Sequence, residues 1–259
     1  MNLPRNHPPV MDIIEVSKTF KRGNNSVRAV RGVNLTIRRQ EFAFLCGPSG
    51  SGKSTLLKIV GCLLKPDSGE VWLDGVNAAH ASESTLGDFR RNKIGFVFQR
   101  FNLVRGLNAI ENVMLPLSLA RPAEKKSHRL RARCLLDSVG LLHEANTDPA
   151  MLSVGQCQRI AIARALVASP RLVLADEPTA SLDSENGLKS IELLRGVTRN
   201  EGASCLVITH DRRIMSPKDR IIEMEDGKIA VTPSPINKLD SPQAFKSPYH
   251  SGKLQESRP

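Results

Sequence analysis

The amino-terminal part of the chain carries short apolar runs with the spacing of β-strands. Residues 11–41 alternate apolar and polar positions on both sides of a Gly-Asn-Asn turn, which predicts strands. Continuous apolar runs predict fully buried strands at EFAFLCG and KIGFVFQ, and SGEVWLDG predicts a further strand between turns. Directly after the first buried run, the pattern predicts an apolar helix at STLLKIVGCLL.

The second half of the chain changes between helical and strand patterns. Residues 101–150 have helical periodicity, with one apolar face formed by Ile110, Val113, Met114 and Leu117. Further along, the pattern predicts strands at RLVLADEP and SCLVITH, a helix at IELLRGVTR between them, and a closing hairpin at RIIEMEDGKIA. Strands that alternate with helices favour a mostly parallel sheet in an α/β core.

Length and composition predict a globular, cytosolic protein. The 259 residues are 40% apolar, which allows a sizeable core in one large domain or two small ones. No run approaches the roughly 18 apolar residues that a membrane span requires. The early prolines interrupt any apolar run of the kind that a signal peptide needs.

The ends of the chain and the cysteines add two further expectations. Residues 231–259 are rich in Pro, Ser and Lys, so we expect this tail and residues 1–10 to be disordered around a domain at 11–230. The cysteines have no metal-ligand spacing and predict buried, reduced thiols. They are Cys46, Cys62, Cys134, Cys157 and Cys205.

The charge of the chain widens the choice of partners without deciding it. A formal net charge of +11 permits a nucleic acid, a nucleotide or an anionic membrane surface as partner. Aromatic residues make up only 4% of the chain, which disfavours a surface that stacks on bases. We therefore do not expect nucleic acid to be the partner.

A glycine-rich stretch between a predicted strand and a predicted helix indicates phosphate binding. GPSGSGKST matches the pattern G-x-x-x-x-G-K-[ST], in which glycines let successive N–H groups face a phosphate chain. We expect Lys53 to reach the β- and γ-phosphates and Ser54 to ligate Mg²⁺. The predicted nucleotide-binding residues are Gly47, Pro48, Ser49, Gly50, Ser51, Gly52, Lys53, Ser54 and Thr55.

Two adjacent acids predict the second half of a hydrolytic site. Asp176 and Glu177 end the apolar run LVLADEP, and we expect this strand to neighbour the one that leads into the phosphate loop. Asp176 is placed to hold Mg²⁺, while Glu177 is free to orient and deprotonate an attacking water. The sequence therefore predicts hydrolysis of a nucleoside triphosphate.

From about Asp12 to Ala230 the chain resembles the ATP-binding subunits of ABC transporters. Besides the two nucleotide motifs, LSVGQ at 152–156 resembles the family's signature and SLD at 181–183 its D-loop. The resemblance implies roles for single residues whose types alone would not indicate a site. These are Gln99 as the Q-loop glutamine with a catalytic and metal-binding role, Asp183 as a D-loop ligand, His210 as the switch histidine and Phe20 as the aromatic that stacks on adenine.

The signature MLSVGQCQRIAIARAL is also a helix start. Ser153 can cap the helix, whose N–H groups attract a γ-phosphate. The resemblance implies that two copies enclose two ATP molecules, with Ser153, Gly155 and Gln156 facing the partner's phosphate loop. Val154 replaces a family glycine. If its φ must be positive, strain of about 1–3 kcal/mol would slow turnover; if φ is negative and the side chain points away from the partner, the valine is nearly silent.

The resemblance implies a P-loop NTPase fold of the α/β class. It comprises a RecA-like core at about 40–99 and 161–230, an antiparallel β layer and a helical subdomain at about 100–160. Function would be ATP hydrolysis by a dimer that drives integral membrane permease subunits from the cytoplasmic face of the membrane. Two stretches, RRNKIGFVFQRFNLVRGLNAIENVMLPL and TASLDSENG, resemble the lipoprotein-release and macrolide-export group.

Two alternatives remain at this level. Val154 would suit a catalytically weak regulatory subunit that binds ATP beside a more active partner. The positive charge would suit a soluble ATPase of the same family that acts on nucleic acid or ribosomes.

Overall fold

A computed structural model of the chain describes residues 8–23, 25–118 and 125–230. The disorder predicted for 1–10 and 231–259 therefore lies outside the described residues, apart from residues 8–10. The strands are β1 (Met11–Arg22), β2 (Asn25–Ile37), β3 (Phe42–Cys46), β4 (Ser68–Leu73), β5 (Val76–Asn77), β6 (Ile94–Val97), β7 (Leu172–Asp176), β8 (Ser204–Ile208), β9 (Arg220–Glu225) and β10 (Lys228–Ala230).

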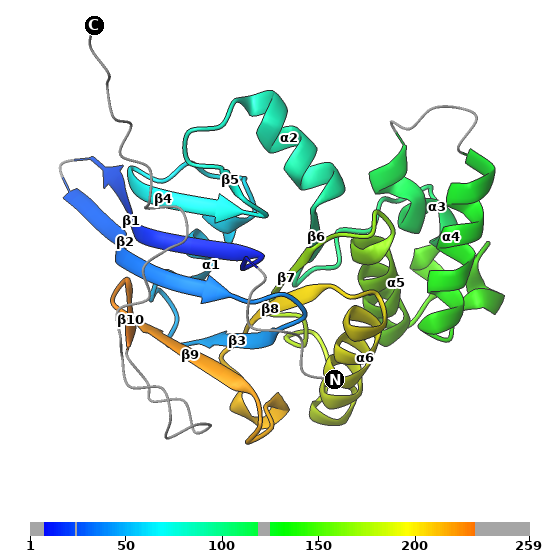
Figure 1. The fold of residues 1–259 in the computed structure, drawn as a ribbon. Helices are drawn as coiled ribbons and strands as arrows, with labels where there is room; N and C mark the ends of the chain where they lie inside the picture. Colours follow the sequence, from blue (N-terminus) through cyan, green and yellow to red (C-terminus); the bar gives the residue numbers. More distant parts are fainter. Residues whose placement is uncertain (1–7, 24, 119–124, 231–259) are drawn as a thin grey trace, which may run out of the picture.

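Six α-helices and four short 3₁₀ helices lie between these strands in the described residues (Figure 1). The α-helices are α1 (Lys53–Val60), α2 (Glu83–Asn92), α3 (Ala109–Met114), α4 (Lys125–Ser138), α5 (Val154–Leu166) and α6 (Ser184–Asn200). The 3₁₀ helices are η1 (Leu115–Leu117), η3 (Leu142–Glu144), η4 (Pro149–Met151) and η5 (Arg212–Ile214).

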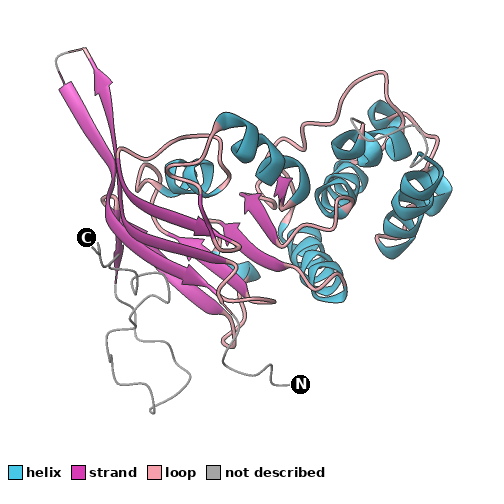
Figure 2. Ribbon diagram, turned by 45° about the horizontal axis from the view of Figure 1, so that its top comes forward, coloured by secondary structure: helices cyan, strands magenta, loops and turns pink. Residues whose placement is uncertain are grey.

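The smaller sheet is the antiparallel layer that the alternating amino-terminal pattern predicted. Its strand order is β2-β1-β4-β5, and every pairing within it is antiparallel. Met11 in β1 lies opposite Ile37 of β2 and Leu73 of β4, and all three side chains are buried. The layer extends into the long hairpin of β1 and β2 (Figure 2).

The larger sheet is mostly parallel and has the order β10-β9-β3-β8-β7-β6. Strands β3, β6, β7, β8 and β9 pair in parallel, and only the β9–β10 hairpin is antiparallel. The order corrects one expectation: β8 lies between β3 and β7, so the strand that ends at Asp176 is not the direct neighbour of β3. The predicted α/β fold with an antiparallel layer is confirmed.

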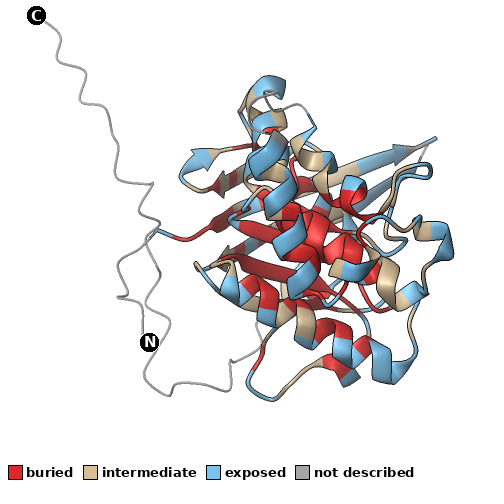
Figure 3. Ribbon diagram, turned by 90° about the vertical axis from the view of Figure 1, so that its right-hand side faces the viewer, coloured by how far each residue is buried: buried red, intermediate tan, exposed pale blue. Residues whose placement is uncertain are grey.

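Two apolar clusters cover the two faces of the larger sheet. One fills the space toward the smaller sheet, α1 and α2, and the other lies under α3, α4, α5 and α6. Because both faces are covered, β3, β7 and β8 are continuous apolar runs rather than alternating ones. Their buried strands lie at the centre of the molecule (Figure 3).

Helices α3, α4 and α5 stand together at one side of the sheet as the helical subdomain (Figure 1). Ile110 and Val113 are fully buried there, as the periodicity predicted, whereas Leu117 lies in η1 and is only half-buried. The domain boundaries stay a prediction, although α5 runs without interruption through the expected boundary at residue 160. Helix α2 was not predicted, because only Leu86 and Phe89 of its ten residues are buried.

The cysteines are all free thiols. Burial raises the pKa of Cys46 and of Cys62 to about 11, so both thiols stay protonated at neutral pH. The prediction of buried thiols is confirmed for these two and for Cys205. It is wrong for Cys134, which is exposed on α4, and Cys157 is half-buried.

Candidate active site

The phosphate loop leaves β3 at Gly47 and ends at the first residue of α1, Lys53. At two positions only glycine fits. Gly47 and Gly52 have φ of 150° and 102°, and a Cβ atom on either would lie 2.0 Å from a backbone oxygen, of Met224 or of Ala29 respectively. The backbone is therefore curled tightly between β9 and β2, with the amino terminus of α1 at its end.

Lys53 turns its side chain back into this curl. The ammonium group donates to the carbonyl oxygens of Gly47 at 2.9 Å and Pro48 at 2.8 Å, and the residue is 7% exposed. A lysine held this way places its charge at the centre of the loop, where N–H groups also converge. Ser54 and Thr55 follow it on the first turn of α1.

Asp176 ends β7 with one carboxylate oxygen, Oδ1, buried and without a hydrogen-bond partner among the described residues. Burial raises the pKa of this carboxyl group, and the nearby charge of Glu177 adds to the effect. A hydrogen bond with the Ser54 hydroxyl opposes it. The phosphate loop and the β7 terminus therefore meet, although β8 separates their strands.

These oxygens fit a magnesium ion. Hydroxyl and carboxylate oxygens are the ligands that Mg²⁺ takes from proteins, and an unpartnered buried carboxylate oxygen is costly without a cation. Within the described ranges, no group of three or more His, Cys, Asp or Glu side chains gathers to hold a metal. An ion beside Asp176 and Ser54 would therefore complete its shell from phosphate and water.

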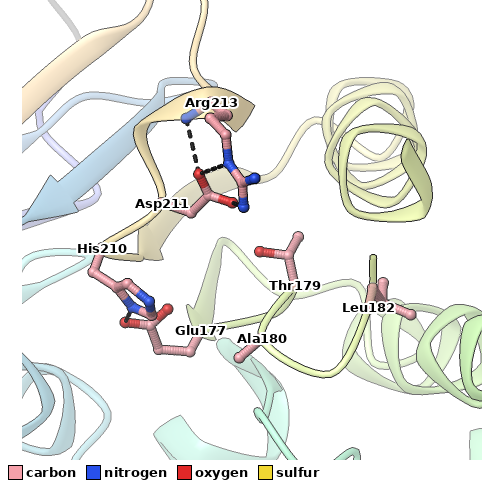
Figure 4. Close-up of a pocket in the computed structure, with 7 residues that line it drawn as sticks. All are labelled: Glu177, Thr179, Ala180, Leu182, His210, Asp211 and Arg213. Carbon is pink, nitrogen blue, oxygen red and sulfur yellow. Dashed lines mark hydrogen bonds and ion pairs between the residues drawn. The ribbon is translucent and has the colours of Figure 1, made fainter. Parts of the chain in front are cut away.

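Glu177 and His210 face each other at the ends of β7 and β8 (Figure 4). Glu177 has φ of 45°, and its N–H donates to the carbonyl oxygen of Ile208 at 2.9 Å. Its Oε1 lies 2.8 Å from Nδ1 of His210. The backbone of Glu177 is thus fixed by Ile208 and its carboxylate by His210, and the residue borders a cavity of about 280 Å³. The lining residues are Glu177, Thr179, Ala180, Leu182, His210, Asp211 and Arg213.

A charged pair beside this cavity was not predicted. Both oxygens of Asp211 accept hydrogen bonds from the Arg213 side chain, each at 2.9 Å, which holds the pKa of Asp211 below its ordinary value. Arg213 also donates to the Ser184 hydroxyl at 2.8 Å. The run THDRR was the available signal, because it places opposite charges directly after His210.

Gln99 lies exposed in the turn that follows β6. Val97 of β6 pairs with Ala175 of β7, so the turn after β6 and the acids after β7 leave the sheet at the same edge. The Gln99 carbonyl oxygen accepts a hydrogen bond from Ser181 at 3.4 Å. Asp183 caps α6 through Asn186 N–H at 2.9 Å, so its part in nucleotide binding stays a prediction.

The signature forms the start of α5. Ser153 is the N-cap: its hydroxyl accepts from Gln156 N–H at 3.2 Å, and Gln156 Oε1 accepts from Ser153 N–H at 2.8 Å. Val154 is the first helical residue, has a negative φ and is 48% exposed. The alternative of positive-φ strain at Val154 is therefore excluded. A Cβ atom on Gly155 would meet nothing within 4 Å, so the fold of this chain does not itself require glycine there.

Phe20 lies on β1 with 41% of its surface exposed. It pairs with Val27 of β2, two residues before the carbonyl of Ala29 that packs against Gly52. The Lys18 ammonium lies 5.9 Å from the centre of its ring. Phe20 is thus on the strand pair that borders the phosphate loop, and adenine stacking stays a prediction.

A strand–loop–helix phosphate site with a buried lysine, and an acid pair at the end of a parallel strand beside it, define a class of protein. The chain is a P-loop nucleoside triphosphatase with a RecA-like core.

Comparison with known proteins narrows the class to a family. A family model described as ABC transporter matches residues 30–180, and the chain belongs to this family as an ATP-binding subunit with ATPase activity. An uncharacterized ABC transporter ATP-binding protein, MJ0796 of Methanocaldococcus jannaschii, is 45% identical over 83% of this chain and 92% of its own length. A solved dimeric structure of MJ0796 in a post-hydrolysis state, bound to ADP and Pi, has a TM-score of 0.75 at 44% identity and covers 85% of this chain and 96% of that one.

Two other relatives carry names that describe export or release. The macrolide export ATP-binding/permease protein MacB of Rhodospirillum rubrum is 42% identical over 86% of this chain, which spans only 34% of MacB. The lipoprotein-releasing system ATP-binding protein LolD 2 of Rhodopirellula baltica is 40% identical over 82% of this chain and 85% of its own length. In the part of the chain that the structure describes, no helix has the length and apolarity needed to cross a bilayer.

Proposed function

We propose that two copies of this chain close on two ATP molecules and use their hydrolysis to drive a membrane permease in export or in lipid or lipoprotein extraction. The observation that carries the proposal is the held carboxylate of Glu177. It lies beside Asp176, whose Oδ1 is buried, and 2.8 Å from His210, at the sheet edge where the phosphate loop also opens. A general base, a cation ligand and a phosphate cradle therefore converge on one place.

Each group has a defined task in this proposal. Glu177 orients a water molecule in line with the γ-phosphate and takes its proton. Lys53 and the N–H groups of the loop stabilise charge on the phosphate oxygens, and His210 contacts the γ-phosphate from the other side. Ser54, Asp176 and Gln99 would hold Mg²⁺, which neutralises phosphate charge when bound.

The second copy is proposed because the family places the signature of one chain at the phosphate loop of another, and Ser153 and Val154 at the start of α5 are exposed here. Ser153 and Gly155 then meet the partner's nucleotide. Close approach of that nucleotide would explain the glycine at 155, which the fold of one chain does not require. The dimeric structure of the relative MJ0796 supports the arrangement. The negative φ of Val154 removes backbone strain as a reason for the regulatory-subunit alternative, whose remaining basis is the contact of the valine side chain with a partner.

The permease is proposed from the relatives and from a cavity of about 320 Å³ between the β6 edge and the helical subdomain. Its walls include Phe98 and Asn102, on either side of Gln99 in the chain, and the 3₁₀ helix η1. MacB and LolD 2 are named for macrolide export and lipoprotein release, and the MacB name includes a permease, which supports a permease as partner of this chain. The groove would receive a cytoplasmic helix of that permease.

The test is Mg²⁺-ATP hydrolysis over a range of protein concentration. The natural chain should turn over despite Val154, with a rate that rises more than linearly with concentration until the dimer is saturated. Glu177→Gln should abolish turnover while ATP binding persists, because the amide occupies the same space but takes no proton. A rate strictly proportional to concentration at low micromolar protein would count against the dimer, and residual turnover in Glu177→Gln against the assigned base.

A further inference from the structure

The loop that follows Gln99 is held in an unfavourable backbone conformation. Phe101 and Asn102 have φ of 58° and 49°, so two successive residues with side chains occupy the left-handed region. Such residues cost free energy and persist only where the surroundings hold them. The question is which group does so, since the Gln99 side of the loop is exposed.

Arg164 supplies the restraint from α5. Its guanidinium donates to the carbonyl oxygen of Asn102 at 2.6 Å and to that of Phe101, which are the two residues with positive φ. Arg164 is 8% exposed, burial lowers its pKa, and no carboxylate pairs with it among the described residues. A buried cation satisfied by backbone oxygens alone is costly, and its position here points to a task beyond packing.

The same helix connects this restraint to the signature. Arg164 is three turns along α5 from the cap Ser153, about 16 Å at 1.5 Å per residue. The helix is tight against β6, because a Cβ atom on Gly95 would lie 2.1 Å from the Ala165 carbonyl oxygen. One rigid body thus carries the signature at its exposed end and grips the Gln99 loop near its other end.

We propose that Arg164 is a positioning residue for hydrolysis: it ties the left-handed Phe101–Asn102 turn to α5, so that closure of the signature on a partner's nucleotide sets the place of Gln99. This rests on the proposed function, in which Gln99 contacts the bound cation. On the opposite side, Ser181 donates to the Gln99 carbonyl oxygen at 3.4 Å. Gln99 is therefore held between the D-loop and the signature helix.

A double-mutant cycle between Arg164 and Gln99 tests the proposal. Arg164→Met should lower kcat by on the order of 10- to 100-fold, as expected when a reacting group is displaced by about 1 Å. It should also raise the Mg²⁺ concentration at half-maximal rate while leaving KM for ATP unchanged. If Arg164 acts through Gln99, the variant with both Gln99→Ala and Arg164→Met should be no slower than Gln99→Ala alone.

The matched control is Arg131→Met. Arg131 of α4 also bonds to α5, through the Leu166 carbonyl oxygen, but it pairs with Glu201, and none of its hydrogen bonds within the described residues reaches the Gln99 loop. This variant should lose thermal stability but keep its Mg²⁺ dependence, and its effect should multiply with that of Gln99→Ala. An Arg164→Met phenotype of the same kind would overturn the proposal, as would independent effects of Arg164→Met and Gln99→Ala.

Two further results separate the possible failures. If Arg164→Met does not fold, Arg164→Lys replaces it in the cycle, because an ammonium can still donate to one of the two carbonyl oxygens. The loss of kcat that Arg164→Lys causes should vanish in the Gln99→Ala background. Persistence of that loss would overturn the proposal. A natural chain that hydrolyses no ATP contradicts the proposed function itself, whereas an active natural chain with independent effects contradicts only the role of Arg164.

Discussion

Val154 shows what a single residue type does and does not reveal. A valine in place of a family glycine predicts strain if its φ is positive, and whether φ is positive is something that the sequence does not contain. Because Ser153 and Gln156 form a capping box, the helix begins at Val154 and its φ is negative. The sequence identified Ser153 as a cap, and this cap determines the sign of φ at Val154.

At the scale of one carboxylate, we expect Asp176 to lower the stability of the fold while it serves hydrolysis. Its pKa is raised by burial, so the folded chain disfavours the charged form at neutral pH. Asp176→Asn should therefore raise the free energy of unfolding at neutral pH by about 1 kcal/mol while it abolishes Mg²⁺-dependent hydrolysis. The gain should shrink as pH falls through the raised pKa and the natural carboxyl group becomes protonated. Urea unfolding at the two pH values measures both effects.

Asp74 is the control with the opposite sign. Burial pushes its pKa upward, but hydrogen bonds from Arg39 and Lys93 outweigh burial and hold the pKa below its ordinary value. Asp74→Asn should lower the free energy of unfolding at neutral pH, and this loss should fade as pH falls through the lowered pKa. If both asparagine variants changed stability in the same direction, the assignment of an unfavourable buried charge to Asp176 would be wrong.

At the scale of elements, two helix caps allow a role of the signature serine in nucleotide contact to be distinguished from its role in helix stability. Ser153 caps α5 and Ser82 caps α2, each accepting an N–H at 3.2 Å. Replacing either serine with alanine should cost about 1 kcal/mol of stability. Only Ser153→Ala should also lower kcat, because Ser82 lies outside the proposed dimer contact.

Thermal unfolding and steady-state kinetics on both alanine variants decide the question. Equal losses of kcat in Ser153→Ala and Ser82→Ala would mean that the signature serine acts through helix stability alone, without touching a nucleotide.

The elements themselves were predicted where apolar patterns were long or continuous. Strands β3, β7 and β8 are buried runs with no competing interpretation. Helix α2 was not predicted because a short helix on the surface needs few apolar residues, and Leu86 and Phe89 alone do not define a period. The conformation of the loop after Gln99 was not predicted for another reason: positive φ at Phe101 depends on Arg164, more than 60 residues further along the chain.

At the scale of the whole molecule, mixing two inactive variants tests whether the site is shared. Lys53→Ala removes the phosphate-loop charge, and Gly155→Glu places a carboxylate where the partner's phosphate would lie. A mixed dimer has one site with both defects and one with neither, so random mixing should restore about a quarter of the natural rate. Each variant alone should be inactive.

The measurement is the hydrolysis rate after equal amounts of the two variants have been combined. No recovery, with dimers shown to form by sedimentation, would mean that each chain uses its own signature. A control mixture of Lys53→Ala with Glu177→Gln should stay inactive, because both defects lie in the half of the site that one chain supplies.

The overall architecture could be predicted because the order of strand and helix patterns specifies an α/β core. Strand order in space could not, since β8 comes last of the three central strands in the chain and yet lies between β3 and β7. Parallel strands need only crossover connections, which leave several orders open. Asp176 and Ser54 therefore meet through an arrangement that local patterns do not contain.

That late central strand has a consequence for how the protein is made. Until β8 (Ser204–Ile208) leaves the ribosome, β7 has no parallel partner that joins it to β3, so a growing chain carries both halves of the site without being able to align them. Pairings so distant in sequence form slowly, because a long segment must be closed first. We expect nascent chains to gain affinity for ATP only after β8 has been translated, leaving their buried apolar strands dependent on chaperones until then.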